Sequence, residues 1–305
     1  MGLRVVFMGT PEFAVPALEA IITSAHEVVG VVTASDKPQG RGLKLVPSAV
    51  KECAAVHGIK ILQPEKLKDP EFHEALKELQ ADVFFVIAFR MLPEVVWSMP
   101  RLGTYNLHAS LLPAYRGAAP INWAIMNGET ETGLTTFKLQ QEIDTGNILF
   151  QDKEFIKESD DAGSLYERLR YKGASLVLKT LDAIENRSAV EIPQVQAGDS
   201  EKSAPKIFRE TCQINWNRTV TETINFIRGL SPYPAAWTIL NGKYFKILKV
   251  ERSNKSTAGD AGEIYSDQKS DLEIRVSDGW VRILELQPEG KRKMKPDEFF
   301  RGNKI

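Results

Sequence analysis

The chain has 305 residues, of which 43% are hydrophobic and 26% charged, and its formal net charge is −1. This is the composition of an ordinary globular protein with two domains or one large one. No run of 18 apolar residues occurs and no basic leader precedes the first apolar run, so we expect neither a transmembrane helix nor a signal peptide.

The first half of the chain alternates between short apolar strands and helices. Thr10 and Pro11 suit the N-cap and the first position of a helix after the first strand. The alternation predicts an α/β fold with a Rossmann-like open, mainly parallel sheet and helices on both faces. The Gly-x-Gly-x-x-Gly pattern of dinucleotide-binding proteins is absent after the first strand. The expected strands are 3–8, 28–33, 59–62, 82–89 and 104–108, and the expected helices are 47–57 and 69–79.

The second half changes character after a long helix expected over 164–185. Two strands, 133–139 and 148–155, precede that helix, and a polar linker rich in proline, glycine and serine follows it. One helix, 219–230, then leads into short alternating segments with turns such as Asn241-Gly242, which predict a small β-barrel. The expected strands of the barrel are 236–240, 244–251, 261–265, 272–277 and 280–287.

The candidate catalytic residues are Asn106, His108 and Asp144. Asn106 and His108 are two apart at the end of a predicted strand, so their side chains point to the same face. A loop containing Pro113 and Gly117 follows, and Asp144 lies in an Asp-Thr-Gly turn. An amide donor, an imidazole and a carboxylate are the parts needed to stabilise an oxyanion and move protons in acyl transfer.

Six segments together resemble the 10-formyltetrahydrofolate-dependent formyltransferases, and the resemblance covers nearly the whole chain. The central block from Asn106 to Pro113 is typical of the superfamily, whereas the 40–48 loop and the 228–236 block resemble the branch that acts on tRNA. The six segments are 5–13, 40–48, 106–113, 144–146, 204–207 and 228–236.

The resemblance implies transfer of a formyl group from 10-formyltetrahydrofolate to the amino group of methionine on initiator Met-tRNA, as used in translation initiation. It implies that the second domain is OB-like and binds tRNA, with domain limits 1–188 and 207–305 and a linker at 189–206. The co-substrate is expected along Ser110, Leu111, Leu112 and Pro113. Its pterin ring is expected near residues 89–92, which include Arg90, Met91 and Leu92, and near the 140–144 loop. The tRNA is expected at Lys37, Arg41 and Lys44 in the basic loop formed by residues 36–48.

Charge is distributed unevenly along the chain. Residues 206–305 hold 18 Lys and Arg against 13 Asp and Glu, so the acidic excess lies in the remainder. A basic C-terminal part can attract a polyanion such as tRNA.

Cys53 and Cys212 are far apart and are expected to be reduced thiols of a cytoplasmic protein. No histidine or cysteine cluster has the spacing of a metal site, and we expect a monomer that needs no metal, membrane or protein partner.

Two other functions remain open from the residues alone. One is a formyltransferase of the same superfamily that acts on a small amine, such as a sugar nucleotide or glycinamide ribonucleotide. The other is an RNA-binding protein without catalytic activity, although the presence of Asn106, His108 and Asp144 argues against it. Formylation of charged initiator tRNA would distinguish all three.

Overall fold

The structure is a computed structural model that describes residues 2–39, 44–194 and 202–305. Contacts divide the chain into two compact units, each made of three segments. The N-terminal unit comprises Met1–Arg116, Gly133–Glu154 and Tyr166–Lys202, and the C-terminal unit comprises Gly117–Thr132, Phe155–Leu165 and Ser203–Ile305. Within the described ranges, no helix is both long enough and apolar enough to span a bilayer.

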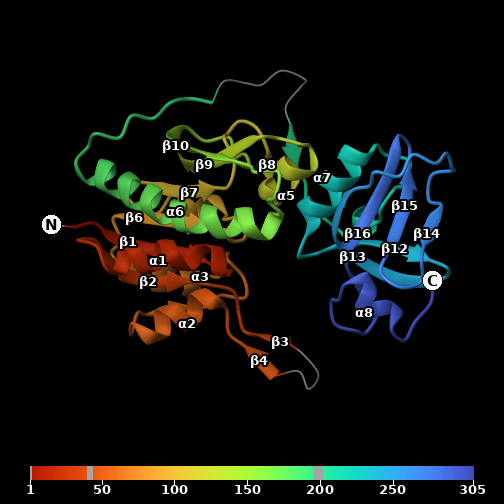
Figure 1. The fold of residues 1–305 in the computed structure, drawn as a ribbon. Coiled ribbons are helices and arrows are strands. Elements are labelled where there is room, and N and C mark those ends of the chain that lie inside the picture. Colours follow the sequence, from red (N-terminus) through yellow and green to blue (C-terminus); the bar gives the residue numbers. More distant parts are fainter. Residues whose placement is uncertain (1, 40–43, 195–201) are drawn as a thin grey trace. The chain divides into compact units, whose positions relative to one another are not determined.

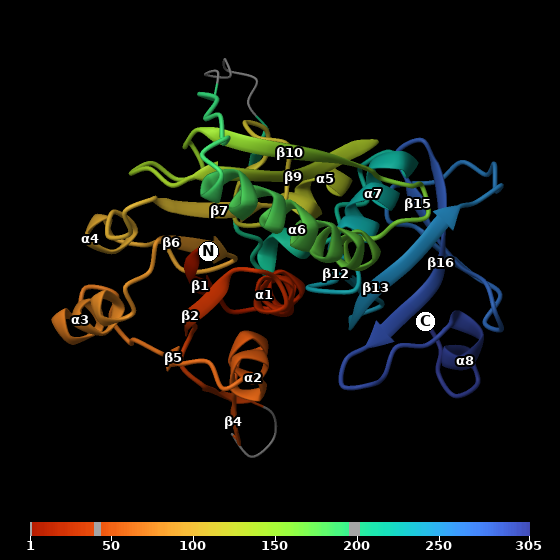
Figure 2. The ribbon, with the colours of Figure 1, turned by 90° about the vertical axis from the view of Figure 1, so that its left-hand side faces the viewer.

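The N-terminal unit is built on a seven-stranded sheet with the strand order β10-β9-β7-β6-β1-β2-β5 (Figures 1 and 2). The five strands from β7 to β5 are parallel, whereas β9 runs antiparallel to β7, so the expected mainly parallel sheet is confirmed. The strands are β1 (Arg4–Gly9), β2 (Glu27–Val32), β5 (Ile61–Leu62), β6 (Val83–Ile87), β7 (Thr104–His108), β9 (Glu131–Lys138) and β10 (Ile148–Phe155).

Helices cover both faces of this sheet, as expected. Helices α1 (Val15–Ile22) and α6 (Ala162–Glu185) lie on one face, and α3 (Pro70–Glu78) and α4 (Glu94–Trp97) lie on the other (Figure 2). On the second face, Phe72 and Leu76 of α3 pack with Val6 and Phe84 of the sheet. Burial of these large side chains is the main stabilising term, at about 1.5–3 kcal/mol each.

Local signals place most of the helix starts. Ser48 caps α2 (Ala49–Val56) and Asp69 caps α3, each accepting a hydrogen bond from a backbone N–H of the first turn. The expected cap at Thr10 is wrong. The chain first forms the 3-10 turn η1 (Glu12–Ala14), whose N-cap is Pro11 and has no side-chain hydrogen bond. The proline in the first turn of α1 is Pro16.

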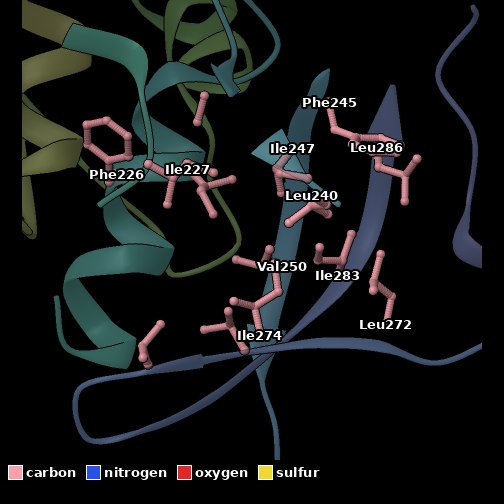
Figure 3. Packing of buried hydrophobic residues seen from close by; sticks show 14 of the residues in the cluster. Phe226, Ile227, Leu240, Phe245, Ile247, Val250, Leu272, Ile274, Ile283 and Leu286 are labelled. Atoms are coloured by element: carbon pink, nitrogen blue, oxygen red, sulfur yellow. The ribbon is translucent and has the colours of Figure 1, made fainter. Parts of the chain in front are cut away.

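The C-terminal unit contains a curled antiparallel sheet of five strands in the order β12-β13-β16-β15-β14, which is consistent with the expected OB-like domain. Helix α7 packs on it, and Phe226 and Ile227 of the helix join Ile247 and Leu286 of the sheet in one apolar core (Figure 3). The elements are α7 (Val220–Leu230), β12 (Ala236–Leu240), β13 (Lys243–Arg252), β14 (Ile264–Ser266), β15 (Leu272–Val276) and β16 (Gly279–Pro288).

Several short elements were not expected from the sequence. Helix α5 (Pro120–Met126) packs against α7 within the C-terminal unit, and α8 (Pro296–Phe300) packs against β16. In the N-terminal unit, β3 (Lys37–Gln39) and β4 (Lys44–Val46) form a two-stranded ribbon. The remaining elements are β8 (Arg116–Gly117), β11 (Ser203–Ala204) and η2 (Glu210–Cys212).

Candidate active site

Asn106 and His108 lie at the carboxyl end of β7, where the parallel part of the sheet meets antiparallel β9. Val86 of β6 pairs with Asn106, and Thr135 of β9 pairs with His108. His108 is only 6% exposed, whereas Asn106 is half-buried, and within the described ranges its side-chain amide makes no hydrogen bond. The carboxyl ends of strands are where open α/β sheets bind ligands. Asn106 therefore presents unused donors at the expected place.

The His108 ring lies between two groups that accept hydrogen bonds and do not donate them. Its Nε2 lies 2.8 Å from the carbonyl oxygen of Tyr115, and its Nδ1 lies 3.8 Å from Oδ2 of Asp144. Because a carbonyl cannot donate, Nε2 carries the hydrogen of that bond. Nδ1 faces a carboxylate at a distance too long for a direct hydrogen bond. The structure thus brings His108 and Asp144 together, 36 residues apart in the chain.

The backbone around the site is held in an uncommon conformation. Tyr115 has φ +61° and Asp144 has φ +55°, both in the left-handed region. For a bulky residue such as Tyr115 this region costs energy, and such strain persists only where surrounding contacts impose it. The carbonyl of Tyr115 in this turn accepts the hydrogen bond from His108.

Two residues that we did not expect brace the loop of Asp144. The carbonyl oxygen of Asp144 accepts hydrogen bonds from Arg116 Nε at 3.0 Å and Gln194 Nε2 at 2.9 Å. Gln194 also donates to the Gly146 carbonyl at 2.8 Å and accepts from Arg116 Nη2 at 2.6 Å. A Cβ on Gly146 would lie 1.6 Å from the Lys138 carbonyl oxygen, so this position requires glycine. Arg116 lies three residues after the block from Asn106 to Pro113, but nothing in the linker sequence indicates a role for Gln194.

The loop of Ser110 to Pro113 is tied to β9 and β10 through one buried hydroxyl. Thr135 Oγ1 donates to the Ser110 carbonyl at 2.7 Å and accepts from the Leu112 N–H at 3.1 Å. Gln151 donates to the same hydroxyl at 3.1 Å and to the Leu112 carbonyl at 2.8 Å. Ser110 itself donates to the Ala114 carbonyl at 2.6 Å. Ser110 is therefore a loop-forming residue in this structure.

The residues expected to contact the folate differ widely in exposure. Met91 is 73% exposed, whereas the side chains of Leu92 and Leu112 are buried. Arg90 donates to the carbonyls of Pro64 at 2.7 Å and Glu65 at 3.0 Å, so its guanidinium holds a neighbouring loop. In the loop before Asp144, Ile143 is 62% exposed although it is apolar. Whether these positions contact folate stays a prediction.

The residues expected to contact tRNA lie in or beside the β3–β4 ribbon. Lys37 is exposed on β3, where it pairs with Val46. The backbone of Lys44 begins β4, and Arg41 lies outside the described residues. At the base of the ribbon, Asp36 bonds Lys51 at 2.7 Å and Gln63 at 2.9 Å, and these hydrogen bonds lower the pKa of the Asp36 carboxyl.

One group of side chains in the described ranges has the composition of a metal site. It consists of His26, Asp182 and Glu185. Both ring nitrogens of His26 are engaged, since Nδ1 accepts from the Leu3 N–H at 3.1 Å and Nε2 lies 3.2 Å from Asp182. The group therefore acts as a link between the start of β1 and the end of α6.

Tyr105 precedes Asn106 on β7. Burial of its phenol raises the pKa of Tyr105 to about 12, so the phenol stays neutral.

Comparison with known proteins assigns the class. Residues 3–181 match the family described as formyl transferase, and residues 206–304 match the family described as formyl transferase, C-terminal domain. Asn106, His108 and Asp144 all lie within the first match. Together with the fold, these two matches assign the protein to the formyl transferases.

Individual relatives show to which branch of the formyl transferases the chain is similar. The methionyl-tRNA formyltransferase of Bacteroides fragilis is 51% identical over 308 residues, covering 98% of this chain and 95% of the relative. The N-formyltransferase from Helicobacter canadensis, in complex with folinic acid and dTDP-3-aminofucose, aligns with a TM-score of 0.69 at 24% identity, over 96% of this chain and 100% of that one. HypX from Aquifex aeolicus in complex with tetrahydrofolic acid aligns with a TM-score of 0.68 at 19% identity, over 99% of this chain and 48% of HypX. These two structures are similar in fold. The chain belongs to the methionyl-tRNA formyltransferase family.

Proposed function

We propose that this protein transfers the formyl group of 10-formyltetrahydrofolate to the free amino group of methionine on initiator Met-tRNA, for use in translation initiation. The observation that carries the proposal is the pairing of His108 with Asp144 beside the unpartnered amide of Asn106 at the end of β7. Formyl transferases use different amines as acceptors. Methionyl-tRNA is the acceptor proposed here because the similarity to a methionyl-tRNA formyltransferase covers 98% of the chain.

The residues at the site fit such a co-substrate. 10-Formyltetrahydrofolate supplies an electrophilic formyl carbonyl, whose oxygen becomes negative when an amine attacks. The free amide donors of Asn106 suit that oxygen, and losing one such donor typically costs about 2.7–4 kcal/mol of transition-state stabilisation. The exposed apolar side chains of Met91 and Ile143 offer surface for a flat ring.

His108 handles the proton through Nδ1 in this proposal. The hydrogen on Nε2 is held by the Tyr115 carbonyl at 2.8 Å, so Nε2 keeps the ring in place. Nδ1 has only the longer contact of 3.8 Å to Asp144, which leaves room for it to exchange a proton with the reacting amine. Asp144 stabilises the positive charge that His108 gains when Nδ1 takes the proton of the attacking amine. The proton then passes to N10 as the bond between N10 and the formyl carbon breaks, which releases tetrahydrofolate and the formylated amine.

Binding of tRNA is assigned to basic groups outside this constellation. The acceptor end of the tRNA would contact the 36–48 loop through Lys37, Arg41 and Lys44. The body of the tRNA would contact the basic 207–305 domain, because cations that pair with phosphates release counterions and thereby favour binding.

The domain limits 1–188 and 207–305 belong to the same proposal. We further infer a cytoplasmic monomer, because translation supplies the substrate in the cytoplasm and this mechanism takes all its groups from one chain.

A formylation assay with 10-formyltetrahydrofolate tests the proposal, with Met-tRNA as one acceptor and a sugar-nucleotide amine and glycinamide ribonucleotide as the others. We expect product only with charged tRNA, and His108→Ala should lower turnover by about 10²–10⁴. His57→Ala is the matched control, because His57 is exposed at the end of α2. Product from a small amine alone, or near-native turnover of His108→Ala, would reject the proposal.

A further inference from the structure

The C-terminal sheet has an outward face as well as the core face. Trp237 on β12 pairs with Lys246 on β13, and Lys246 pairs in turn with Gln287 on β16, so the three side chains form one row across three strands. The next pair on the same face is Ile239 and Tyr244. Their neighbours along the strands belong to the buried core, because successive residues of a strand point to opposite faces.

A cavity of about 460 Å³ opens on this face. The row of Trp237, Lys246 and Gln287 lines it together with Tyr244, and Arg209 and Tyr233 line it from two flanking segments. We call this cavity the aromatic pocket. Its volume is within the range of small-molecule sites, and it is large enough for a single nucleotide.

Aromatic rings dominate the pocket and its rim. The rings of Trp237 and Tyr244 stack with their centroids 5.4 Å apart and an interplanar angle of 28°. Tyr233 is 81% exposed and Phe208, which also lines the pocket, is 55% exposed. Aromatic side chains left this open gain free energy when a flat partner covers them, and nucleobases are the flat partners that stack on such platforms.

The cations of the pocket are not neutralised by the protein. Across the described part of the chain, neither Arg209 nor Lys246 forms an ion pair, although Glu289 also lines the pocket. The Arg209 guanidinium lies 5.3 Å from the centroid of the Tyr244 ring. The pocket therefore holds two cations and one carboxylate next to a stacked pair of aromatic rings. Single-stranded nucleotides are bound by this combination, because the rings can stack with a base and the cations can pair with a phosphate.

We propose that the aromatic pocket binds one unstacked nucleotide of the tRNA substrate, with its base among the rings of Trp237, Tyr244 and Tyr233 and its phosphate at Arg209 and Lys246. The inference rests on the proposed function, which supplies the tRNA. Stacking tolerates any base, so the pocket contributes affinity and position rather than sequence selection.

The test measures the dissociation constant for Met-tRNA, its salt dependence and the kinetics of formylation in the full-length protein. Tyr244→Leu keeps an apolar side chain and removes the ring, and Tyr265→Leu on β14 is its control outside the pocket. Lys246→Gln removes a pocket charge, and Lys249→Gln makes the same change on the same strand outside the pocket. Melting temperatures establish that the variants are folded.

Tyr244→Leu should weaken tRNA binding about tenfold, as expected for the loss of one stacked base, without changing the Michaelis constant for the folate. Lys246→Gln should weaken binding several-fold and lower the slope of log affinity against log salt by about 0.7–0.9. Each control variant should weaken tRNA binding less than the pocket variant with which it is paired. If Tyr244→Leu does not fold, Lys246→Gln and Arg209→Gln decide the question.

Two results would overturn the inference while leaving the proposed function intact. One is wild-type tRNA affinity in the folded pocket variants, with active formylation of Met-tRNA. The other is binding of free AMP, followed by tryptophan fluorescence, that depends on Tyr244 but is not displaced by tRNA. Absence of formylation by the wild type itself would instead reject the proposed function.

Discussion

Replacement of Thr135 by valine removes one hydroxyl from the centre of the site without changing the shape of the side chain. Thr135 is completely buried, and its hydroxyl bonds the Ser110 carbonyl, the Leu112 N–H and the Gln151 amide. In Thr135→Val the first two groups become buried without a partner, whereas Gln151 keeps its bond to the Leu112 carbonyl. At about 1–3 kcal/mol for each unsatisfied group, the expected loss is about 2–6 kcal/mol.

The loss of these hydrogen bonds can appear in two measurements, the free energy of unfolding and the Michaelis constant for the folate. If the 110–113 loop stays in place, the free energy of unfolding in urea falls by the full amount. If the loop moves so that its main-chain groups reach water, stability falls less and the Michaelis constant for 10-formyltetrahydrofolate rises, because the loop is expected to lie along the folate. We therefore expect a lower free energy of unfolding, a higher Michaelis constant, or both.

Thr136→Val is the matched control. Thr136 is the next residue of β9, is equally buried and bonds the hydroxyl of Thr180 at 2.9 Å, which itself donates to the Leu176 carbonyl. The substitution leaves no carbonyl or N–H without a partner, so it should cost only about 0.5–1.5 kcal/mol and should not alter folate kinetics. Wild-type stability and folate kinetics in Thr135→Val, or equal effects of the two substitutions, would refute the reasoning.

Two further predictions concern charge. Asp144→Asn removes the negative charge 3.8 Å from Nδ1 of His108, so turnover should fall because the positive charge that forms on His108 during proton transfer loses its carboxylate partner; wild-type turnover would exclude this role. In the C-terminal unit, backbone N–H groups of Ser270, Asp271 and Lys269 lower the pKa of Asp267 to about 2. A lowered pKa in the folded state gives stability that is present above the ordinary value of 3.8 and is lost as the pH falls towards 2. Asp267→Asn should therefore flatten the pH dependence of unfolding between pH 4 and 2, and NMR titration of the carboxyl carbon in the wild type should give the low pKa directly; a titration near 3.8 would contradict it.

Much of the fold could be predicted because its signals are local. The apolar runs of β1, β6 and β7 are bounded by turn residues, and their alternation with helices leaves few arrangements other than a mainly parallel sheet. Short elements were missed for the converse reason. Helices α4 and α8 have four and five residues, too few for a hydrophobic period to show, and they depend on tertiary packing.

The sequence by itself determined that Asn106 and His108 share one face, because the two-residue repeat of a strand leaves no other arrangement. Only the tertiary structure decided what each ring nitrogen of His108 contacts, since this depends on the left-handed turn at Tyr115 and on the loop of Asp144. The same holds for Gln194, which reaches Asp144 from 50 residues away, and for the row of Trp237, Lys246 and Gln287, which depends on the register of three strands. Residue spacing fixes directions within one element, whereas contacts between distant segments follow from how complete elements pack, and no local pattern encodes them.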